Sequence, residues 1–260
     1  MGSAQSQGQL WGVQARNWAD LMEKLSLPIY HVVFDRTNVG KGTRLLDIGC
    51  GTGLAAQLAT QLGAHITGLD ASEAKLIIAR ERVPHGDFCC GDMEALPYAD
   101  VSFDVVTGFH VLQFADNSLS TLRETRRVVK PGGYVAMSVW GRLEDCEFAT
   151  TLKAVMDCLP APVEESRGTF AVVSPGKLEV LMEQAGLTID ARGDVSCPFT
   201  YPDAETAWEA ISSYGTLVAA IRAAHEATIK QAVLTSLVPF KTPDGGYRQE
   251  NLIHYVIATT

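Results

Sequence analysis

The stretch LLDIGCGTGLAAQLA, residues 45–59, decides the fold of this chain. An apolar run containing Asp47 leads into three glycines, Gly49, Gly51 and Gly53, and a helix-forming segment follows. Glycine adopts backbone conformations that other residues avoid, so this spacing predicts a sharp turn between a buried strand and a helix. Such a turn lets a ligand approach the main chain and the free amide groups at the start of the helix.

The composition indicates a globular protein that acts on small molecules. Of the 260 residues, 47% are hydrophobic and 20% are charged, which is ordinary for a folded domain. The net charge of -9 disfavours nucleic acid as a partner, because phosphate backbones are bound by clustered basic residues. Six cysteines without regular spacing, and no secretory leader, predict reduced thiols in the cytoplasm.

Two further absences in the sequence limit the kind of protein. No uncharged apolar run approaches the roughly 20 residues of a membrane span. No H-x-x-x-H or C-x-x-C pair occurs, so we predict no metal site.

Strands and helices alternate through the first half of the chain. Period-two and buried apolar runs predict strands at residues 43–49, 65–70, 86–92, 102–109 and 134–140, and later at 188–199 and 251–260. Helical patterns fill the intervals. This alternation predicts an α/β, Rossmann-like, doubly wound sheet of seven mostly parallel strands with an antiparallel last strand.

Helices outside this alternation predict a cap. Residues 11–25 have the spacing of one amphipathic helix, and residues 203–237 are helical with an apolar face. We expect a single domain over residues 1–260, with N-terminal lid helices at about 8–38. Helical cap insertions are expected at about 142–172 and 203–240.

Acidic residues follow the second and third predicted strands. Ligands of parallel sheets bind at the carboxyl ends of the strands. Asp70 stands where a carboxylate can accept both hydroxyls of a ribose, or it is the acid that begins the helix after Ser72. Asp92 can accept a hydrogen bond from an adenine amino group while Met93 packs on the ring, or it belongs to an acidic surface turn. Together with the glycines, these residues predict a nucleoside site.

Four segments resemble the class I S-adenosylmethionine-dependent methyltransferases, in the branch that contains the ubiquinone and menaquinone methyltransferases. They are LLDIGCGTG, GLDAS, GDMEALPYADVSFDVV and RVVKPGGYVAMSVW, within residues 40–141. The resemblance implies S-adenosylmethionine as cofactor and S-adenosylhomocysteine as product. It implies the following contacts: the methionine part with Asp47, Gly49, Cys50 and Gly51; the ribose with Asp70 and Ala71; the adenine with Asp92 and Met93; the sulfonium side with Gly108 and Phe109.

Methyl transfer to a small acceptor by in-line displacement follows from this resemblance, and the aromatic residues named below indicate that the acceptor is apolar or aromatic. His110, directly after the fourth strand, is a candidate general base or else a residue that only lines the pocket. Aromatic residues predict an acceptor pocket, although such residues at helical spacing more often belong to the core; they are Trp18, Tyr30, Phe114, Trp140 and Tyr214.

Two other functions stay open at this point. A protein that binds S-adenosylmethionine but has another activity would keep the same motifs. A nicotinamide-dependent oxidoreductase is disfavoured, because the third glycine of the dinucleotide pattern G-x-G-x-x-G is replaced by Leu54.

Overall fold

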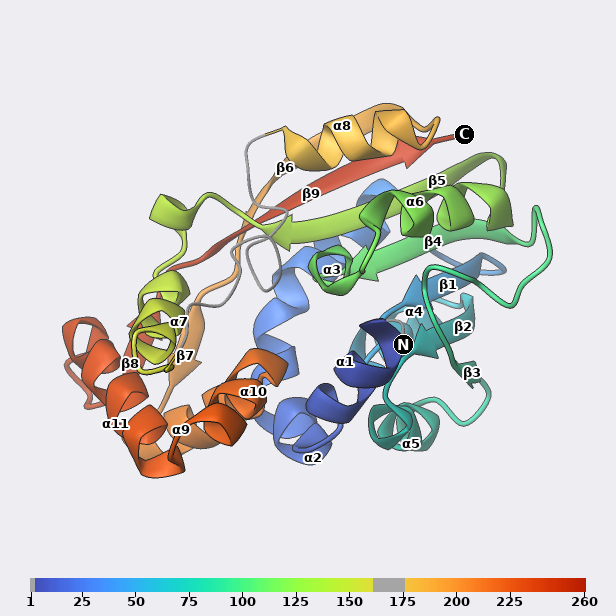
Figure 1. Cartoon of the computed structure of the whole chain (residues 1–260). Coiled ribbons are helices and arrows are strands. Elements are labelled where there is room, and N and C mark those ends of the chain that lie inside the picture. Colours follow the sequence, from blue (N-terminus) through green and yellow to red (C-terminus); the bar gives the residue numbers. More distant parts are fainter. Residues whose placement is uncertain (1–2, 161–175) are drawn as a thin grey trace.

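A computed structural model describes residues 3–160 and 176–260 and has a seven-stranded sheet at its centre (Figure 1). The strand order is β3-β2-β1-β4-β5-β9-β6, and β9 is antiparallel to both of its neighbours. The strands are β1 (Arg44–Ile48), β2 (His65–Asp70), β3 (Asp87–Cys90), β4 (Phe103–Phe109), β5 (Val129–Trp140), β6 (Thr188–Ser196) and β9 (Leu252–Thr259). The predicted fold class, including the antiparallel last strand, is confirmed.

Helices cover both faces of the sheet because its strands bury side chains on both sides. Leu45 and Leu46 of β1 belong to two different core clusters, one on each face, as expected from the alternation of side chains along a strand. On one face lie α6 (Ser118–Val128) and α8 (Lys177–Gln184). The other face carries α3 (Leu27–Arg36), α4 (Leu54–Gln61) and α5 (Glu73–Arg82).

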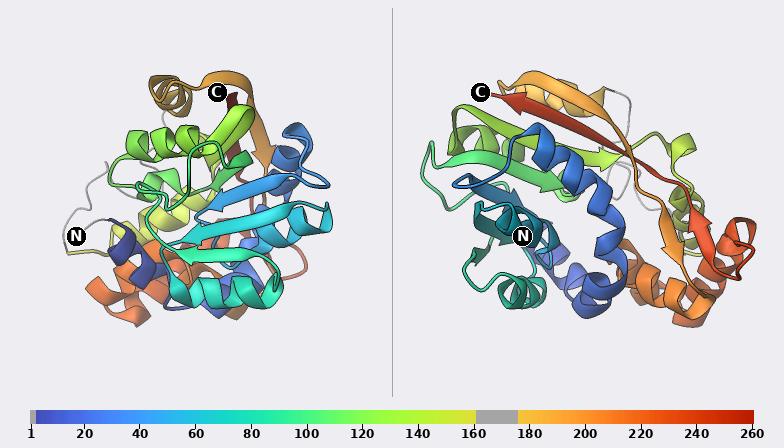
Figure 2. Two further views of the ribbon diagram at one scale, coloured as in Figure 1. Left: turned by 90° about the vertical axis from the view of Figure 1, so that its right-hand side faces the viewer. Right: turned by 180° about the vertical axis from the view of Figure 1, so that it is seen from behind.

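Helices from the two ends of the chain lie side by side along the carboxyl edge of the sheet (Figures 1 and 2). The N-terminal segment consists of α1 (Ser3–Trp11), α2 (Ala15–Asn17), the π-helical turn η1 (Trp18–Met22) and the 3-10 turn η2 (Glu23–Ser26). The late segment contains η4 (Leu143–Asp145), α7 (Phe148–Met156), α9 (Ala204–Ser212), α10 (Gly215–Ala223), α11 (Glu226–Leu237) and η5 (Val238–Phe240). A further short turn, η3 (Leu112–Phe114), follows β4. Residues 161–172 of the expected cap lie outside the described residues.

The structure differs from the sequence prediction in three local features. The single helix expected over residues 11–25 is broken into short pieces, so that Trp11 and Trp18 both turn toward Lys75. The strand predicted at residues 134–140 begins earlier, at Val129, so that β5 includes residues 131–133. A small hairpin of β7 (Phe199–Tyr201) and β8 (Tyr247–Gln249) was not predicted; three-residue strands carry too little periodicity to be recognised.

Helix α1 is seated directly on the end of β2. A Cβ atom at Gly8 would lie 2.1 Å from the carbonyl oxygen of Ala71, so only glycine permits this approach. Within the described residues, no helix is both long and apolar enough to traverse a lipid bilayer.

Two ion pairs fasten the N-terminal segment to α5, and they differ in burial. Arg82 pairs with Glu23, and these side chains are 19% and 4% exposed. Arg16 pairs with Glu81, with both side chains more than half exposed, at 59% and 54%. Removal of one partner from a buried pair leaves an uncompensated charge, whereas an exposed pair is screened by water.

We therefore expect Arg82→Ala to lower the free energy of unfolding by about 3 kcal/mol. The matched variant Arg16→Ala should lower it by less than about 1 kcal/mol. Urea unfolding followed by circular dichroism measures both values. Equal losses would show that burial of the Arg82 pair is not what holds the segment.

Candidate active site

The three glycines form a left-handed loop between β1 and α4. Gly49, Gly51 and Gly53 have φ angles of 67°, 55° and 82°, a region that favours glycine. A Cβ at Gly49 would lie 2.5 Å from Val111 Cγ2, and one at Gly53 would lie 2.9 Å from Ala79 Cβ. Gly49 and Gly51 line a cavity at this edge of the sheet, so the loop exposes main chain to a ligand as the sequence predicts.

Asp70 holds this loop in place. Its carboxylate accepts hydrogen bonds from the main-chain N–H of Gly51 and of Ser72, both at 2.8 Å. Asp70 also lines the cavity together with Ala71. The carboxylate thus accepts a hydrogen bond at the start of the next helix and also lines the cavity. The first position fits the helix-terminal interpretation of Asp70, and the second is compatible with the ligand-binding interpretation.

Asp47, at the end of β1, is a buried acid in the cavity wall. Its carboxylate accepts a hydrogen bond of 2.7 Å from the Thr107 hydroxyl. Burial, assisted by the nearby carboxylates of Glu23 and Asp70, raises the pKa of Asp47 to about 7, although the hydrogen bond from Thr107 opposes the shift. A ligand group with positive charge would compensate this acid, whereas an anion would not.

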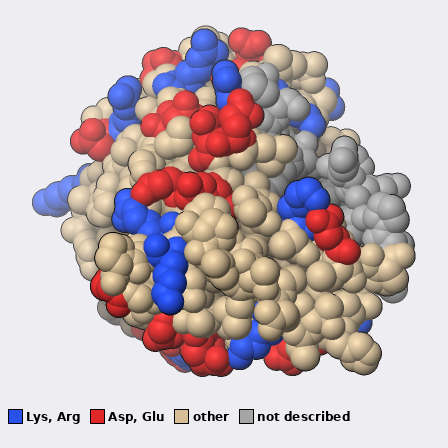
Figure 3. Space-filling model, turned by 90° about the vertical axis from the view of Figure 1, so that its left-hand side faces the viewer, with Lys and Arg blue, Asp and Glu red and all other residues tan. Residues whose placement is uncertain are grey.

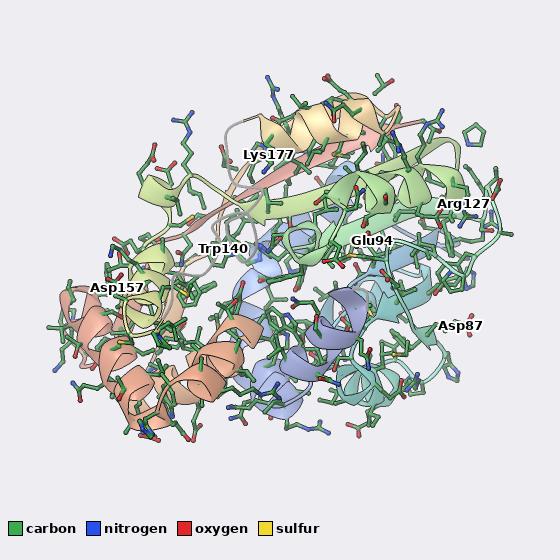
Figure 4. The ribbon with its side chains drawn as sticks, in the orientation of Figure 1. Asp87, Glu94, Arg127, Trp140, Asp157 and Lys177 are labelled. Carbon is green, nitrogen blue, oxygen red and sulfur yellow. The ribbon has the colours of Figure 1, made fainter. Side chains whose placement is uncertain are left out.

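The loop that carries Asp92 and Met93 is fixed from outside the cavity. Arg127 donates hydrogen bonds to the carbonyl oxygens of Leu96 (3.0 Å) and Tyr98 (2.7 Å). It also forms ion pairs with Asp100 and Glu124. The carboxylate of Glu94 accepts from the main chain at residues 116 and 117. Figure 4 shows Arg127 and Glu94 on the side of the sheet where this loop runs. Asp92 and Met93 therefore line the cavity from a loop that these hydrogen bonds hold in place.

His110 directly follows β4 in a left-handed conformation with φ 53°. The side chain lines the cavity beside Trp140, with ring centroids 5.4 Å apart. Its Nδ1 atom is buried and has no hydrogen-bond partner among the described residues. Because the ring is withdrawn from water, the pKa of His110 is lowered to about 4. The imidazole is consequently neutral at physiological pH and can accept a proton.

Aromatic side chains form the remaining wall beside His110. Trp140 stacks on Phe148 at 5.6 Å and meets Phe199 edge-on at 5.7 Å. Tyr30 packs against Phe109 at 4.6 Å. This side of the cavity is apolar, unlike the acid-lined side beside the glycine loop.

One cavity brings together nearly all residues that the sequence singled out. The lining includes His110, the five aromatic residues Trp18, Tyr30, Phe114, Trp140 and Tyr214, and Asp47, Gly49, Cys50, Gly51, Asp70, Ala71, Asp92, Met93 and Phe109. Gly108 is set back within β4, where a Cβ would lie 2.6 Å from Met137 Sδ. Its role there is close packing behind the cavity.

Several lining residues were missed from the sequence, and three of them bear on the chemistry of the cavity. Glu23 is buried, accepts a 2.6 Å hydrogen bond from the Thr52 hydroxyl and pairs with Arg82. Lys75 lies with its ammonium 4.2 Å and 4.3 Å from the ring centroids of two tryptophans. The third is Phe199. The sequence held a signal for only one of these three residues: Lys75 is a charged residue among the apolar positions of the helix after Ser72. Glu23 and Phe199 carry no comparable signal.

Comparisons with known proteins show the family to which this chain belongs. Residues 46–137 match the family described as "Methyltransferase domain". The "Ubiquinone biosynthesis O-methyltransferase" of Dinoroseobacter shibae is 34% identical over 63% of this chain and 67% of its own length. The chain belongs to the class I S-adenosylmethionine-dependent methyltransferases, as the resemblance predicted, and S-adenosylmethionine is the methyl donor of such an enzyme.

Two further comparisons agree with this family and with the fold. The protein of the same name from Ruegeria pomeroyi is 36% identical over 62% of this chain, and the match spans 66% of the relative, just under two thirds. The structure of the 4+2 cyclase SpnF superposes with a TM-score of 0.59 and 23% identity, over 89% of this chain and 80% of that one. At this identity, SpnF shows a shared fold.

The residues of the methyltransferase cavity fit this cofactor. The glycine loop presents the main chain of Gly49 and Gly51 to the cavity without side chains. Asp47 is a buried acid that a sulfonium or ammonium group would neutralise.

The raised pKa of Asp47 predicts a specific dependence of stability on pH. A folded-state pKa of about 7 instead of 3.8 means that the folded protein holds this proton more tightly, so stability falls as pH rises from about 4 to 7. The free energy of unfolding of the wild type, relative to Asp47→Asn, should decrease over this range by up to about 4 kcal/mol. Urea titrations of both proteins at several pH values measure the difference. A constant difference would contradict the assignment.

Proposed function

We propose that this chain transfers a methyl group from S-adenosylmethionine to a small, apolar or aromatic acceptor and releases S-adenosylhomocysteine. The observation that carries the proposal is the division of one cavity into an acid-lined glycine cradle and an aromatic wall, with neutral His110 among the lining. The relatives from Ruegeria and Dinoroseobacter are named as O-methyltransferases of ubiquinone biosynthesis. Their names support a hydroxyl group on a ring as the acceptor.

The ends of β1, β2 and β3 support contacts with successive parts of the cofactor. We assign the methionine part to Asp47, Gly49, Cys50 and Gly51, the ribose to Asp70 and Ala71, and the adenine to Asp92 and Met93. Phe109 borders the sulfonium side, and Gly108 supports it from behind. Each of these positions comes from a loop that hydrogen bonds or close packing hold in one conformation, which is what positioning of two reactants requires.

The N-terminal segment and the late helices belong to the same proposal. Trp11 and Trp18 line the cavity from one side, and Tyr214 lines it from the other. We propose that residues 8–38 act as the lid and residues 142–172 and 203–240 as the cap of a single domain over residues 1–260. Their function is to exclude water and bulky acceptors from the methyl group.

Two measurements test the proposed function. Calorimetric titration with S-adenosylhomocysteine should show binding, while titration with a nicotinamide dinucleotide should show none. Incubation with cofactor labelled on its methyl group and a panel of phenols, catechols and reduced quinones should then label one class of acceptor. Binding without transfer to any acceptor would favour the alternative, a protein of this fold with another activity.

His110 is assigned the role of general base toward a hydroxyl acceptor. We expect His110→Asn to lower kcat by about 100-fold, because the proton acceptor is lost, and to change the cofactor Kd less than twofold. Asparagine suits the test because it tolerates the left-handed backbone of this position.

The pH profile adds a second readout on His110. Only the neutral imidazole accepts a proton, and its pKa is about 4. At saturating cofactor, the contribution of His110 to kcat should therefore be lost only as the pH falls toward about 4. A kcat that is unchanged in His110→Asn on the true acceptor would remove this role.

Surface charge and the state of the cysteines support a proposal about the protein's compartment and its partner. On the face in Figure 3, acidic and basic side chains are interspersed around a broad area without charges, and no continuous basic surface is present among the residues described there. All six cysteines are free thiols, which suits a reducing compartment. We therefore propose a cytoplasmic enzyme whose partner is a small molecule and not a nucleic acid.

A further inference from the structure

Lys75 is an unusual residue in the wall of this cavity. It lies in the first turn of α5, is 4% exposed, and is the single lysine or arginine among the described residues that line the cavity. Its ammonium lies 4.2 Å from the ring centroid of Trp11 and 4.3 Å from that of Trp18. Burial lowers the pKa of Lys75 to about 8, and the nearby acids Asp70 and Glu23 oppose this shift. The side chain is therefore mostly a cation near pH 7.

The amino-acid tail of S-adenosylmethionine carries a carboxylate, which a cavity rich in acids would repel. Of the lining residues, Asp47, Asp70, Asp92 and Glu23 are all acidic. The carboxylate of the tail must find a positive partner or pay a large desolvation penalty on entering the cavity.

The start of helix α4 would be the usual place for an anion, but the protein's own Glu23 already stands there. Its carboxylate lies 3.4 Å from the main-chain N–H donor of Leu54 and accepts from the Thr52 hydroxyl. Arg82 forms an ion pair with the same carboxylate of Glu23. A Cβ at Gly51 would lie 3.7 Å from Glu23 Oε1, so this acid borders the glycine loop itself.

We propose that Lys75 binds the carboxylate of the cofactor's amino-acid tail, with Trp11 and Trp18 holding its ammonium at the cavity. This inference rests on the proposed function, since it concerns the same cofactor. The tryptophan rings shield the ammonium from water on two sides, which strengthens its attraction for an anion.

The test compares two ligands that differ in the tail. S-adenosylhomocysteine carries the carboxylate, whereas 5′-methylthioadenosine shares the adenosine and the thioether but lacks the amino acid. We expect Lys75→Met to weaken S-adenosylhomocysteine binding by about 10- to 100-fold, the range of a hydrogen bond to a charged group. Binding of 5′-methylthioadenosine should change less than twofold. Calorimetric titration measures all four affinities without any turnover.

Two variants complete the experiment. Lys41→Met removes the same charge from an exposed turn before β1 and should leave both affinities unchanged. If Lys75→Met does not fold, as judged by circular dichroism, Lys75→Gln keeps a polar head without the charge and is subject to the same comparison.

Each outcome bears on one of the two proposals. Equal weakening of both ligands would mean that Lys75 only supports the tryptophans, and unchanged binding would mean that another group holds the carboxylate; either result overturns this inference and leaves the proposed function intact. Wild-type protein that binds neither ligand would overturn the proposed function as well.

Discussion

The hydrogen bond that Asp70 accepts from the N–H of Gly51 joins the ends of the first two strands, and a second bond, from the N–H of Ser72, fixes the carboxylate at the end of β2. The glycine loop after β1 has little to hold it in a single conformation by itself, because glycine has the greatest freedom of all residues in the unfolded chain. Asp70 removes this freedom at Gly51, and main-chain bonds from Gly49 and Cys50 to Leu69 add to the restraint. The position of the glycine loop relative to the end of β2 is thus set by a single carboxylate and the strand pairing beneath it.

The cavity combines several acids at close quarters, and each is accommodated in a different way. Asp47 has a pKa near 7 and can take up a proton, Glu23 is neutralised by Arg82, and Asp70 is satisfied by main-chain N–H groups. Lys75 adds one positive charge close to Asp70 and Glu23. A sulfonium cofactor with a zwitterionic tail is complementary to this distribution.

The parts of the fold and site that follow from short-range patterns could be predicted from the sequence. The glycine spacing, Asp70 and Asp92 each sit at a fixed place relative to a strand end, so the strand pattern alone brings them to one edge of the sheet. Glu23, Lys75 and Phe199 could not be found in this way, because their position in the cavity depends on how segments distant in sequence pack. The same cause explains the broken helix at residues 11–25, where contacts of Trp11 and Trp18 with Lys75 override helical propensity.

The contact between Gly8 and the Ala71 carbonyl makes the first helix of the chain a part of the cavity wall. The other end of the chain is held elsewhere, where Thr260 bonds the main chain at Lys130 and Gly132, and Figure 1 shows the two termini well apart. A purification tag or fluorescent partner fused ahead of residue 3 therefore adds bulk to a helix that lines the cavity. The same fusion after Thr260 would start beside Lys130 and Gly132, which do not line the cavity, so the carboxyl terminus is the better attachment point for labelling or immobilising this protein.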